Sequence, residues 1–289
     1  MPIVKIEDVC FTYGKKTPYE IHALDNVNIA IEENLITGII GHTGSGKSTL
    51  VQMFNGLVKP DSGRVIVDGE DIWDKPKQIG NVRFKVGMVM QYPEYQLFAE
   101  TVGEDIAYGP KNMGLDDEKI RYRVQKSARF CGLDASVLEK SPFDLSGGQK
   151  RRVALAGVMA MEPKLLVLDE PAAGLDPRGR REILGGIKEY QRQSQNSVVI
   201  VSHSMEDMAM YCDRIIVMAN GKMILEGTPS QVFSQAEILQ SAGLDVPEVT
   251  KIVTALRKRG VKISSDIYTI QGAIEAIAKY ASGGDTDVF

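Results

Sequence analysis

Residues 36–49 read Ile-Thr-Gly-Ile-Ile-Gly-His-Thr-Gly-Ser-Gly-Lys-Ser-Thr, and their pattern is the strongest indication of the fold in the sequence. Its first five residues form a short apolar run that predicts a buried strand. Residues 41–48 then match the pattern G-x-x-x-x-G-K-[ST]. Glycines at 41, 44 and 46 let the backbone curl and point N–H groups at phosphate oxygens. The stretch therefore predicts a strand, a phosphate-binding loop and a helix, as in an α/β nucleotide-binding fold.

The helix after the loop is expected to run from about Gly46 to Phe54. Its N-terminus adds free N–H groups and a dipole that favour an anion. In such a loop Lys47 reaches the β- and γ-phosphates, and the Ser48 hydroxyl can bind Mg²⁺. A plain glycine-rich turn is the alternative, but the strand–loop–helix context favours nucleotide binding. The residues predicted to bind ATP here are Gly41, His42, Thr43, Gly44, Ser45, Gly46, Lys47, Ser48 and Thr49.

The bulk composition is that of an ordinary globular protein with room for one large domain and an appendage, since the chain has 289 residues and 25% are charged. A net charge of −4 argues against a nucleic-acid partner. We expect no signal peptide and no segment that crosses a bilayer. Three scattered cysteines suit reduced thiols in a cytosol, and their spacing predicts no metal site.

The other elements follow from hydrophobic patterns. Alternation of apolar and polar residues over 3–13 and 27–31 predicts antiparallel strands. Charged residues at helical spacing over 101–140 predict a helical insertion, and a long helix should follow from Gly148 to Met161. Further strands are predicted at 63–69, 86–90, 165–168 and 197–201, with a hairpin around Asn220-Gly221 within 215–225.

Polar residues stand at the carboxyl ends of three predicted strands, where ligands gather in α/β sheets. Asp169 is placed to hold Mg²⁺ through water, and Glu170 to activate the attacking water as a general base. His203 occupies a similar position, which favours a γ-phosphate contact over a purely structural role. Gln91 could sense Mg²⁺ or the water, or be an ordinary loop residue.

A second predicted anion site lies far along the chain, where a helix is expected to start near Lys150. One nucleotide on one chain has no obvious need for two such sites. The economical explanation is a pair of chains, head to tail, in which each phosphate loop is capped by the partner's second site. The residues predicted to act on the partner's ATP are Leu145, Ser146, Gly147, Gly148 and Gln149.

Asp176 has two compatible interpretations. An Asp followed by Pro177 predicts a helix N-cap with proline in the first helical position. A capping Asp can also face a partner chain, so we keep it as a candidate dimer contact.

These motifs, in this order, resemble the ATP-binding cassette (ABC) ATPases over roughly residues 3–230. The resemblance implies an α/β ABC-type core with an antiparallel β subdomain, and a Mg-dependent ATPase with Glu170, His203, Gln91 and Lys47 as catalytic residues. It implies Mg²⁺ contacts from Ser48, Gln91 and Asp169. Tyr13 resembles the family's adenine-stacking aromatic, although a plain core aromatic is the alternative. The matching motifs are Walker A (Gly41–Ser48), Q-loop (Gln91), signature (Leu145–Gln149), Walker B (Leu165–Asp169), catalytic glutamate (Glu170), D-loop (Gly174–Asp176) and H-loop (His203).

Finer features resemble one branch, the ATPase subunits of energy-coupling factor (ECF) transporters, most closely the A-prime type. They lie at residues 91–102, 106–112 and 154–158. The resemblance implies a second ECF-type ATPase as a heterodimer partner, a transmembrane scaffold subunit, and exchangeable substrate-capture subunits for vitamins or metal ions. It implies a peripheral position on the cytoplasmic face of a prokaryotic cell membrane. The alternatives are the ATPase of another ABC transporter class, a soluble ABC-type mechanical ATPase, and a cassette that binds ATP without hydrolysing it.

The resemblance also divides the chain into an ABC ATPase domain over 1–230, with a helical subdomain at about 92–160, and a C-terminal extension over 231–289. Helices are predicted in the extension at 246–257 and 270–280, with contacts between the two ATPases and a loose tail after them. The segment after Gln91 is a candidate dock for the membrane scaffold, because an apolar aromatic patch is rimmed there by acids. Those acids are Glu94, Glu100, Glu104 and Asp105.

Overall fold

The computed structural model describes residues 1–282 and contains two β-sheets. An antiparallel sheet has the strand order β2-β1-β4-β5. A larger sheet has the order β10-β9-β3-β8-β7-β6 and is parallel except for β10. The strands are β1 (Pro2–Tyr13), β2 (Ile21–Glu32), β3 (Ile36–Ile40), β4 (Ser62–Val67), β5 (Glu70–Asp71), β6 (Val86–Val89), β7 (Leu165–Asp169), β8 (Ser197–Val201), β9 (Arg214–Ala219) and β10 (Lys222–Gly227).

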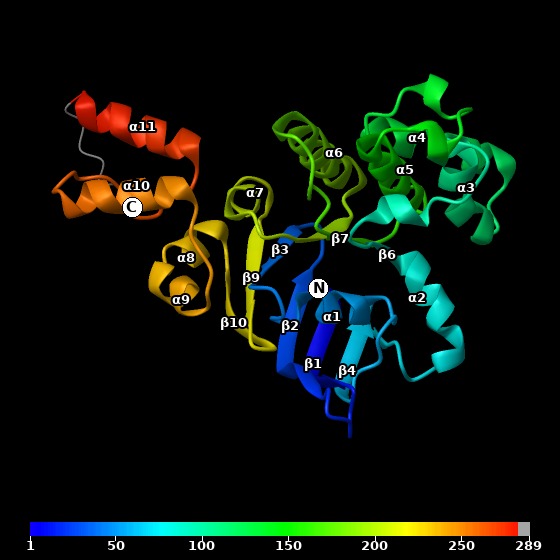
Figure 1. The fold of residues 1–289 in the computed structure, drawn as a ribbon, viewed down its shortest axis with the longest axis horizontal. Helices are drawn as coiled ribbons and strands as arrows, with labels where there is room; N and C mark the ends of the chain where they lie inside the picture. The colour runs from blue at the N-terminus through cyan, green and yellow to red at the C-terminus, as the bar shows by residue number, and fades with distance from the viewer. Residues whose placement is uncertain (283–289) are drawn as a thin grey trace.

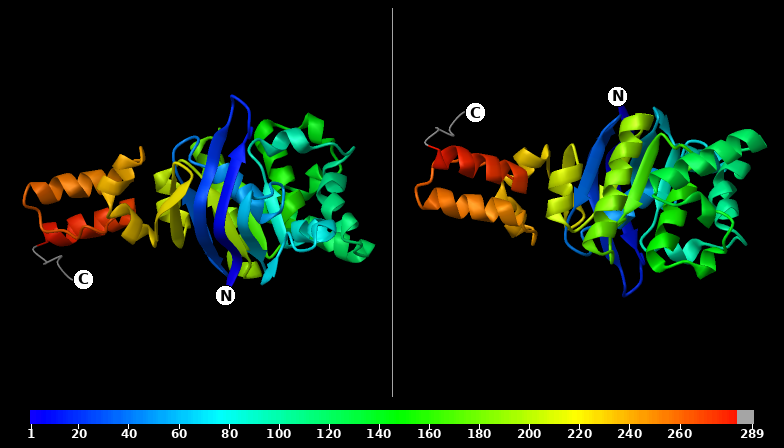
Figure 2. Two further views of the ribbon diagram at one scale, coloured as in Figure 1. Left: turned by 90° about the horizontal axis from the view of Figure 1, so that it is seen from below. Right: turned by 90° about the horizontal axis from the view of Figure 1, so that it is seen from above.

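Two groups of helices lie at opposite ends of the molecule (Figure 1). Helices α3, α4 and α5 form one end of the molecule, and α10 and α11 form the opposite end, as both views in Figure 2 also show. The helices are α1 (Lys47–Phe54), α2 (Ile79–Lys85), α3 (Val102–Asn112), α4 (Asp117–Phe130), α5 (Gly147–Met159), α6 (Pro177–Ser194), α7 (Met205–Tyr211), α8 (Pro229–Phe233), α9 (Ala236–Ser241), α10 (Glu248–Lys258) and α11 (Ile270–Ala281), with short 3₁₀ turns η1 (Pro76–Gln78), η2 (Pro93–Gln96), η3 (Ala135–Val137) and η4 (Pro142–Asp144).

The parallel sheet is buried on both faces, which explains its continuous apolar strands. Ile39 of β3 faces a core shared with the antiparallel sheet, where Leu50 and Phe54 of α1 are fully buried. Ile36 and Ile40 point to the opposite face and join a second core. Helix α1 is thus fixed against apolar residues of both sheets, and the loop before it starts from a rigid base.

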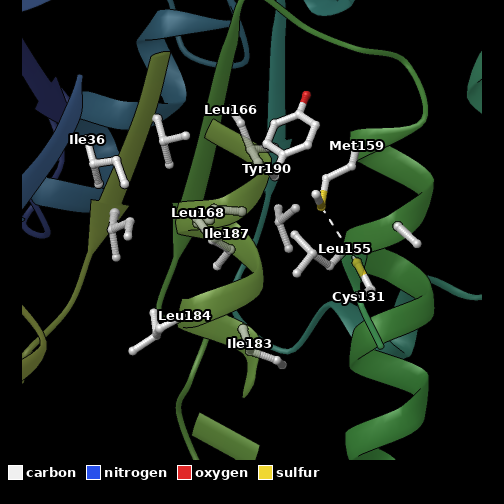
Figure 3. Close-up of a cluster of buried hydrophobic side chains, with 14 of the residues drawn as sticks. Ile36, Cys131, Leu155, Met159, Leu166, Leu168, Ile183, Leu184, Ile187 and Tyr190 are labelled. Atoms are coloured by element: carbon white, nitrogen blue, oxygen red, sulfur yellow. Dashed lines mark hydrogen bonds between the residues drawn. The ribbon is translucent and has the colours of Figure 1, made fainter. Parts of the chain in front are cut away.

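The second core joins the sheet to the helices (Figure 3). Leu166 and Leu168 of β7 meet Ile187 and Tyr190 of α6, and Leu155 of α5 belongs to the same buried cluster. Tyr190 is only 1% exposed, and its ring meets the edge of the Phe130 ring at 5.5 Å between centroids. The helix that carries the second predicted anion site therefore packs into the same core as the strand that ends at Asp169.

Most predicted elements are confirmed, including the α/β class and the antiparallel sheet. The predicted strands at 36–40 and 197–201 match β3 and β8, and Asn220 and Gly221 turn the β9–β10 hairpin with positive φ angles. The predicted start of α5 near Lys150 is wrong. The helix begins at Gly147 because Ser146 and Gln149 form a reciprocal capping box, which satisfies the first N–H groups three residues earlier.

The C-terminal helices have a small core of their own, built on Val253, Ile263 and Ala273. The two helices predicted here are confirmed as α10 and α11, and Gly260 terminates the first of them with φ +90°. Beyond Ser282 the predicted loose tail lies outside the described residues. Within residues 1–282, the helices are too short or too polar to span a bilayer.

Candidate functional site

Glycine is required at two points of the loop between β3 and α1. A Cβ atom at Gly41 would lie 2.4 Å from the Met218 carbonyl oxygen in β9. Gly46 has φ +100°, and a Cβ there would lie 2.5 Å from the Ala23 carbonyl oxygen in β2. The hairpin also supports the loop, because the Gly221 amide donates to the Ser45 carbonyl at 3.1 Å. Strands β2 and β9 therefore hold the loop in one shape.

Lys47 lies buried at the centre of this loop. Its Nζ donates to the carbonyl oxygens of Gly41 at 2.7 Å and His42 at 3.0 Å. Burial lowers the pKa of Lys47, and the nearby Glu170 and Asp169 carboxyls oppose that shift. The ammonium group and the N-terminus of α1 converge on the same space, which makes it strongly attractive to an anion.

The last residue of β7, Asp169, and the residue after it, Glu170, are acids with perturbed pKa values. Burial raises the pKa of Asp169, and a hydrogen bond from Ser48 and the charge of Lys47 oppose the shift. Burial and then the neighbouring Asp169 charge raise the pKa of Glu170 to about 7. Glu170 has φ +54°, and its amide donates to the Val201 carbonyl of β8 at 2.9 Å. A carboxyl with this pKa is suited to accept a proton near neutral pH.

His203 and Glu170 face each other across the site. His203 Nε2 lies 3.1 Å from Glu170 Oε1, yet among residues 1–282 this buried oxygen accepts no hydrogen bond. Partial burial lowers the pKa of His203, and the Lys47 charge lowers it further, so its ring favours the neutral form. A buried carboxylate oxygen without a donor costs free energy, and a water molecule or a ligand would satisfy it.

Most residues predicted to bind ATP or act in catalysis line one cleft of about 430 Å³, but Gly41 and His42 are not among its lining residues. Gln91, after β6, is among its lining residues. The Tyr13 hydroxyl lies 3.2 Å from Thr49 Oγ1, and Tyr13 is 42% exposed. Three lining residues were not predicted from the sequence, namely Ile21, Ala23 and Val201. Only their positions in β2 and β8 could have indicated them. The cleft is lined by Tyr13, Ile21, Ala23, Thr43, Gly44, Ser45, Gly46, Lys47, Ser48, Thr49, Gln91, Asp169, Glu170, Val201 and His203.

The protein oxygens that could hold a metal are few. Ser48, Gln91 and Asp169 line the same cleft, and residues 1–282 contain no cluster of three or more His, Cys, Asp or Glu side chains suited to a metal ion. This donor set fits Mg²⁺, which is usually held by one or two protein oxygens, phosphate oxygens and water. It does not fit a metal that needs a full protein cage.

The N-terminus of α5 lies outside this cleft, because within residues 1–282 none of the five predicted signature residues lines it. Ser146 is exposed, and its side chain caps the helix. A Cβ at Gly147 would meet nothing within 4 Å, and one at Gly148 would meet only Leu175 Cδ2, at 3.7 Å. Asp176 caps α6 as predicted, accepting from the Gly179 amide at 2.6 Å.

Two of the four acids in the candidate docking segment are wrongly placed by the sequence analysis. Glu94 is paired with Arg151 at 2.9 Å, and its side chain is only 16% exposed. Asp105 accepts from the amides of Phe98 and Ala99 at 3.1 and 3.0 Å. Both carboxylates are therefore engaged within the chain. Only Glu100 and Glu104 remain as exposed acids of that set.

Comparison with known proteins decides the family. Residues 24–173 match the model of the ABC transporter family. The chain belongs to the ABC transporter ATPases. The energy-coupling factor transporter ATP-binding protein EcfA2 of Caldanaerobacter subterraneus subsp. tengcongensis is 52% identical over 283 residues, covering 98% of this chain and 99% of that protein. The EcfA2 protein of Clostridium acetobutylicum is 53% identical over 280 residues, covering 96% and 98%.

Solved structures agree with this ABC ATPase fold. The structure of cbiO1 from Clostridium perfringens, described as part of the ABC transporter complex cbiONQ, has a TM-score of 0.75 and 39% identity, and covers 89% of this chain and 99% of its own. A dimeric post-hydrolysis state of the cassette MJ0796, bound to ADP and Pi, has a TM-score of 0.71 and 30% identity, covering 78% and 98%. These matches confirm the predicted ABC fold, the ECF branch and an ATPase coupled to transport.

Proposed function

We propose that this chain binds ATP and Mg²⁺ in the cleft around Lys47, and that hydrolysis there powers solute uptake by an ECF transporter. The observation that carries the proposal is the buried Glu170 carboxyl, with its pKa raised to about 7 and one oxygen unsatisfied, beside the anion-binding N-terminus of α1. The full-length match to EcfA2 proteins supports the transport role.

The side chains divide the work as follows. Lys47 and the N–H groups of the loop hold the phosphates, and the partly exposed Tyr13, which lines the cleft, stacks on adenine. Bound Mg²⁺ would neutralise phosphate charge, with Ser48, Gln91 and Asp169 as its protein contacts. Glu170 takes a proton from the attacking water, and the neutral His203 ring contacts the γ-phosphate.

A second ATPase chain completes the site. The exposed N-terminus of α5 has no ligand in its own chain's cleft, and its glycines leave room for a phosphate to approach. We assign Leu145–Gln149 to the partner's ATP and Asp176 to the contact between the chains. The partner is a second ECF-type ATPase, which makes the assembly a heterodimer. The dimeric state of MJ0796 supports such pairing.

The C-terminal extension is a second contact between the two ATPases. Four apolar side chains of α11 are exposed at helical spacing, and among the described residues they form an apolar stripe along that helix that nothing covers. The extension has only a small core of its own, so covering this stripe would stabilise it. The exposed residues are Ile270, Ile274, Ile277 and Tyr280.

Membrane subunits dock at the segment after Gln91. Tyr92, Tyr95, Phe98 and Tyr108 are all more than half exposed, and the Phe98 and Tyr108 rings meet edge to face at 4.9 Å. This patch suits a helix of a transmembrane scaffold subunit at the cytoplasmic face of a prokaryotic membrane. The scaffold carries substrate-capture subunits for vitamins or metal ions, so the cargo is chosen by another polypeptide.

The test uses the transporter complex purified from membranes and reconstituted in vesicles. Lys47→Ala should abolish ATP binding at this site and ATP-driven uptake while the complex still assembles. Uptake that persists without ATP binding would contradict the proposed function.

Docking is tested in the same vesicles with Glu100→Lys and Glu104→Lys combined. We expect this variant to weaken retention on the membrane and uptake, with nucleotide binding intact. A matched reversal at two exposed acids elsewhere, Glu33→Lys with Glu70→Lys, should leave both unchanged. If the two double variants show the same membrane retention and the same uptake, Glu100 and Glu104 do not contribute to docking.

A further inference from the structure

Arg151 is a buried cation one turn into α5, with a side chain only 8% exposed. Its guanidinium donates through all three nitrogens. Nε and Nη2 reach the two carboxylate oxygens of Glu94 at 3.2 and 2.9 Å, and Nη1 donates to the carbonyl of Ala173. The bidentate pair fixes both distance and orientation, which a lysine could not do.

Glu94 connects Arg151 to Gln91. It lies in η2, three residues after Gln91, and η2 packs against α5. Burial alone would raise the pKa of Glu94, but the bonds from Arg151 and the backbone hold it below its ordinary value, so the carboxylate is charged. Between them Tyr92 has φ +57° and Pro93 is buried, so the turn has little freedom. A displacement of Arg151 is therefore passed to Gln91.

Ala173 connects Arg151 to the loop between Glu170 and Asp176. The Ala173 amide donates to the Glu170 carbonyl at 3.2 Å, which makes a tight turn directly after the proposed base. Leu175 lies beside Gly148 at the start of α5. The loop is thus attached to α5 at two points, one polar and buried, one apolar.

We propose that Arg151 is a positioning residue for ATP hydrolysis, tying the Gln91 segment and the Glu170–Asp176 loop to the signature end of α5 as one unit. The inference rests on the proposed function. When the N-terminus of α5 closes on the partner's phosphate, Gln91 and Asp176 move with it. Separating these parts would leave an uncompensated buried charge, so partial closure is disfavoured.

The test measures kcat and KM for ATP in the assembled complex. Arg151→Met should lower kcat by about 10- to 100-fold, the order of loss that a displaced catalytic group produces. KM should change by less than about twofold, because Arg151 does not line the nucleotide cleft. The matched control is Arg123→Met in α4, since Arg123 also holds a carbonyl, that of Met161, and a carboxylate, that of Glu162. It should keep the wild-type kcat.

A double-mutant cycle identifies the partner. Glu94→Gln keeps the side chain's shape and should lower kcat with KM unchanged, and adding it to Arg151→Met should cause no further loss. If Arg151→Met does not fold, the kcat and KM of Glu94→Gln alone test the proposal. A kcat for Arg151→Met equal to that of Arg123→Met, a rise in KM alone, or additive losses would each overturn the proposal.

The failure of this inference is distinguishable from failure of the proposed function. If the wild-type complex hydrolyses ATP and Glu170→Gln does not, the proposed function stands whatever Arg151 does. If the wild-type complex shows no ATP hydrolysis, the proposed function itself is wrong.

Discussion

The N-termini of α1 and α5 are both helix ends preceded by glycines, but they are built in opposite ways. The α1 end is enclosed: Lys47 is buried among loop carbonyls, and two acids with raised pKa values lie beside it. The α5 end is open: Ser146 caps it from within the chain, and its glycines border free space. The α1 end thus lines a cleft that also holds a lysine and two acids, whereas within residues 1–282 none of the signature residues of the α5 end lines that cleft.

This difference is what our proposal of a shared site explains, in which the two ends are halves of one site and belong to different chains. A helix N-terminus alone attracts an anion weakly, by about 0.3–1 kcal/mol at an exposed surface. The α1 end adds enclosure and charge within its own chain. The α5 end can add them only when a partner brings a phosphate already bound.

Among these predictions, Glu170→Gln should have the largest effect, because it removes the proposed base from the enclosed α1 end. The amide keeps the shape but loses the proton acceptor, so hydrolysis should fall by roughly 10²–10⁴ while ATP binding persists. The complex should accumulate as an ATP-bound closed dimer, seen by size-exclusion chromatography. Near-wild-type turnover would show that the base lies elsewhere.

Gly148→Asp tests the open end. The substitution fits its own chain, since a Cβ there makes only an ordinary contact, but it places a carboxylate against the partner's phosphate. An unpaired buried charge costs about 3–5 kcal/mol, so ATP-driven pairing should weaken by roughly 10²–10⁴. Affinity for ATP at the chain's own cleft should survive, measured separately by titration. Gly148→Ala is the matched control, and a loss of own-site binding would refute the two-chain site.

The pH profile of kcat tests the role of Glu170 in the enclosed site at the N-terminus of α1. The pKa of Glu170 is raised to about 7 by burial, so below that pH the carboxyl is protonated and cannot act as a base. The rate should therefore rise about tenfold per pH unit toward pH 7 and level off above it. The residual rate of Glu170→Gln should lack this inflection. A wild-type profile that is flat through pH 7 would contradict the role.

Ser146→Ala gives the smallest expected effect and separates the two roles of this residue. Losing the cap should lower the free energy of unfolding by about 1 kcal/mol. Own-site ATP affinity should not change, because Ser146 lies outside that cleft. Chemical denaturation and nucleotide titration of the same preparation check both. Ser146→Asp would be expected to keep the cap and still impair pairing through its charge.

Local patterns were enough to predict the enclosed half. The apolar run of β3, the glycines after it and the acids at the end of β7 are local sequence patterns. The positions of Lys47, Asp169 and Glu170 at strand and helix ends could therefore be predicted before the structure was known. The start of α5 was predicted too late because two consecutive glycines suggest a flexible loop. The capping box of Ser146 and Gln149 instead allows the helix to begin at the first of these glycines.

Long-range pairing could not be predicted in the same way. Glu94 and Asp105 look like surface acids in the sequence, yet one pairs with Arg151 and the other caps backbone amides. Charge alone does not show whether a carboxylate faces water or a buried arginine 57 positions away. The short helices α2, α7, α8 and α9 were not predicted because they have too few residues to show a hydrophobic period.

The β9–β10 hairpin has a consequence for the order in which the chain folds. Its tip closes the phosphate loop, because Gly221 donates to Ser45 and accepts from the Asp25 amide. At about 5–20 residues per second, the hairpin leaves the ribosome on the order of ten seconds after the loop. Until then a nascent chain carries every residue of its phosphate loop without the wall that shapes it. We therefore expect nucleotide to stabilise chains that have been synthesised past the hairpin more than shorter fragments, which lack this support for the loop.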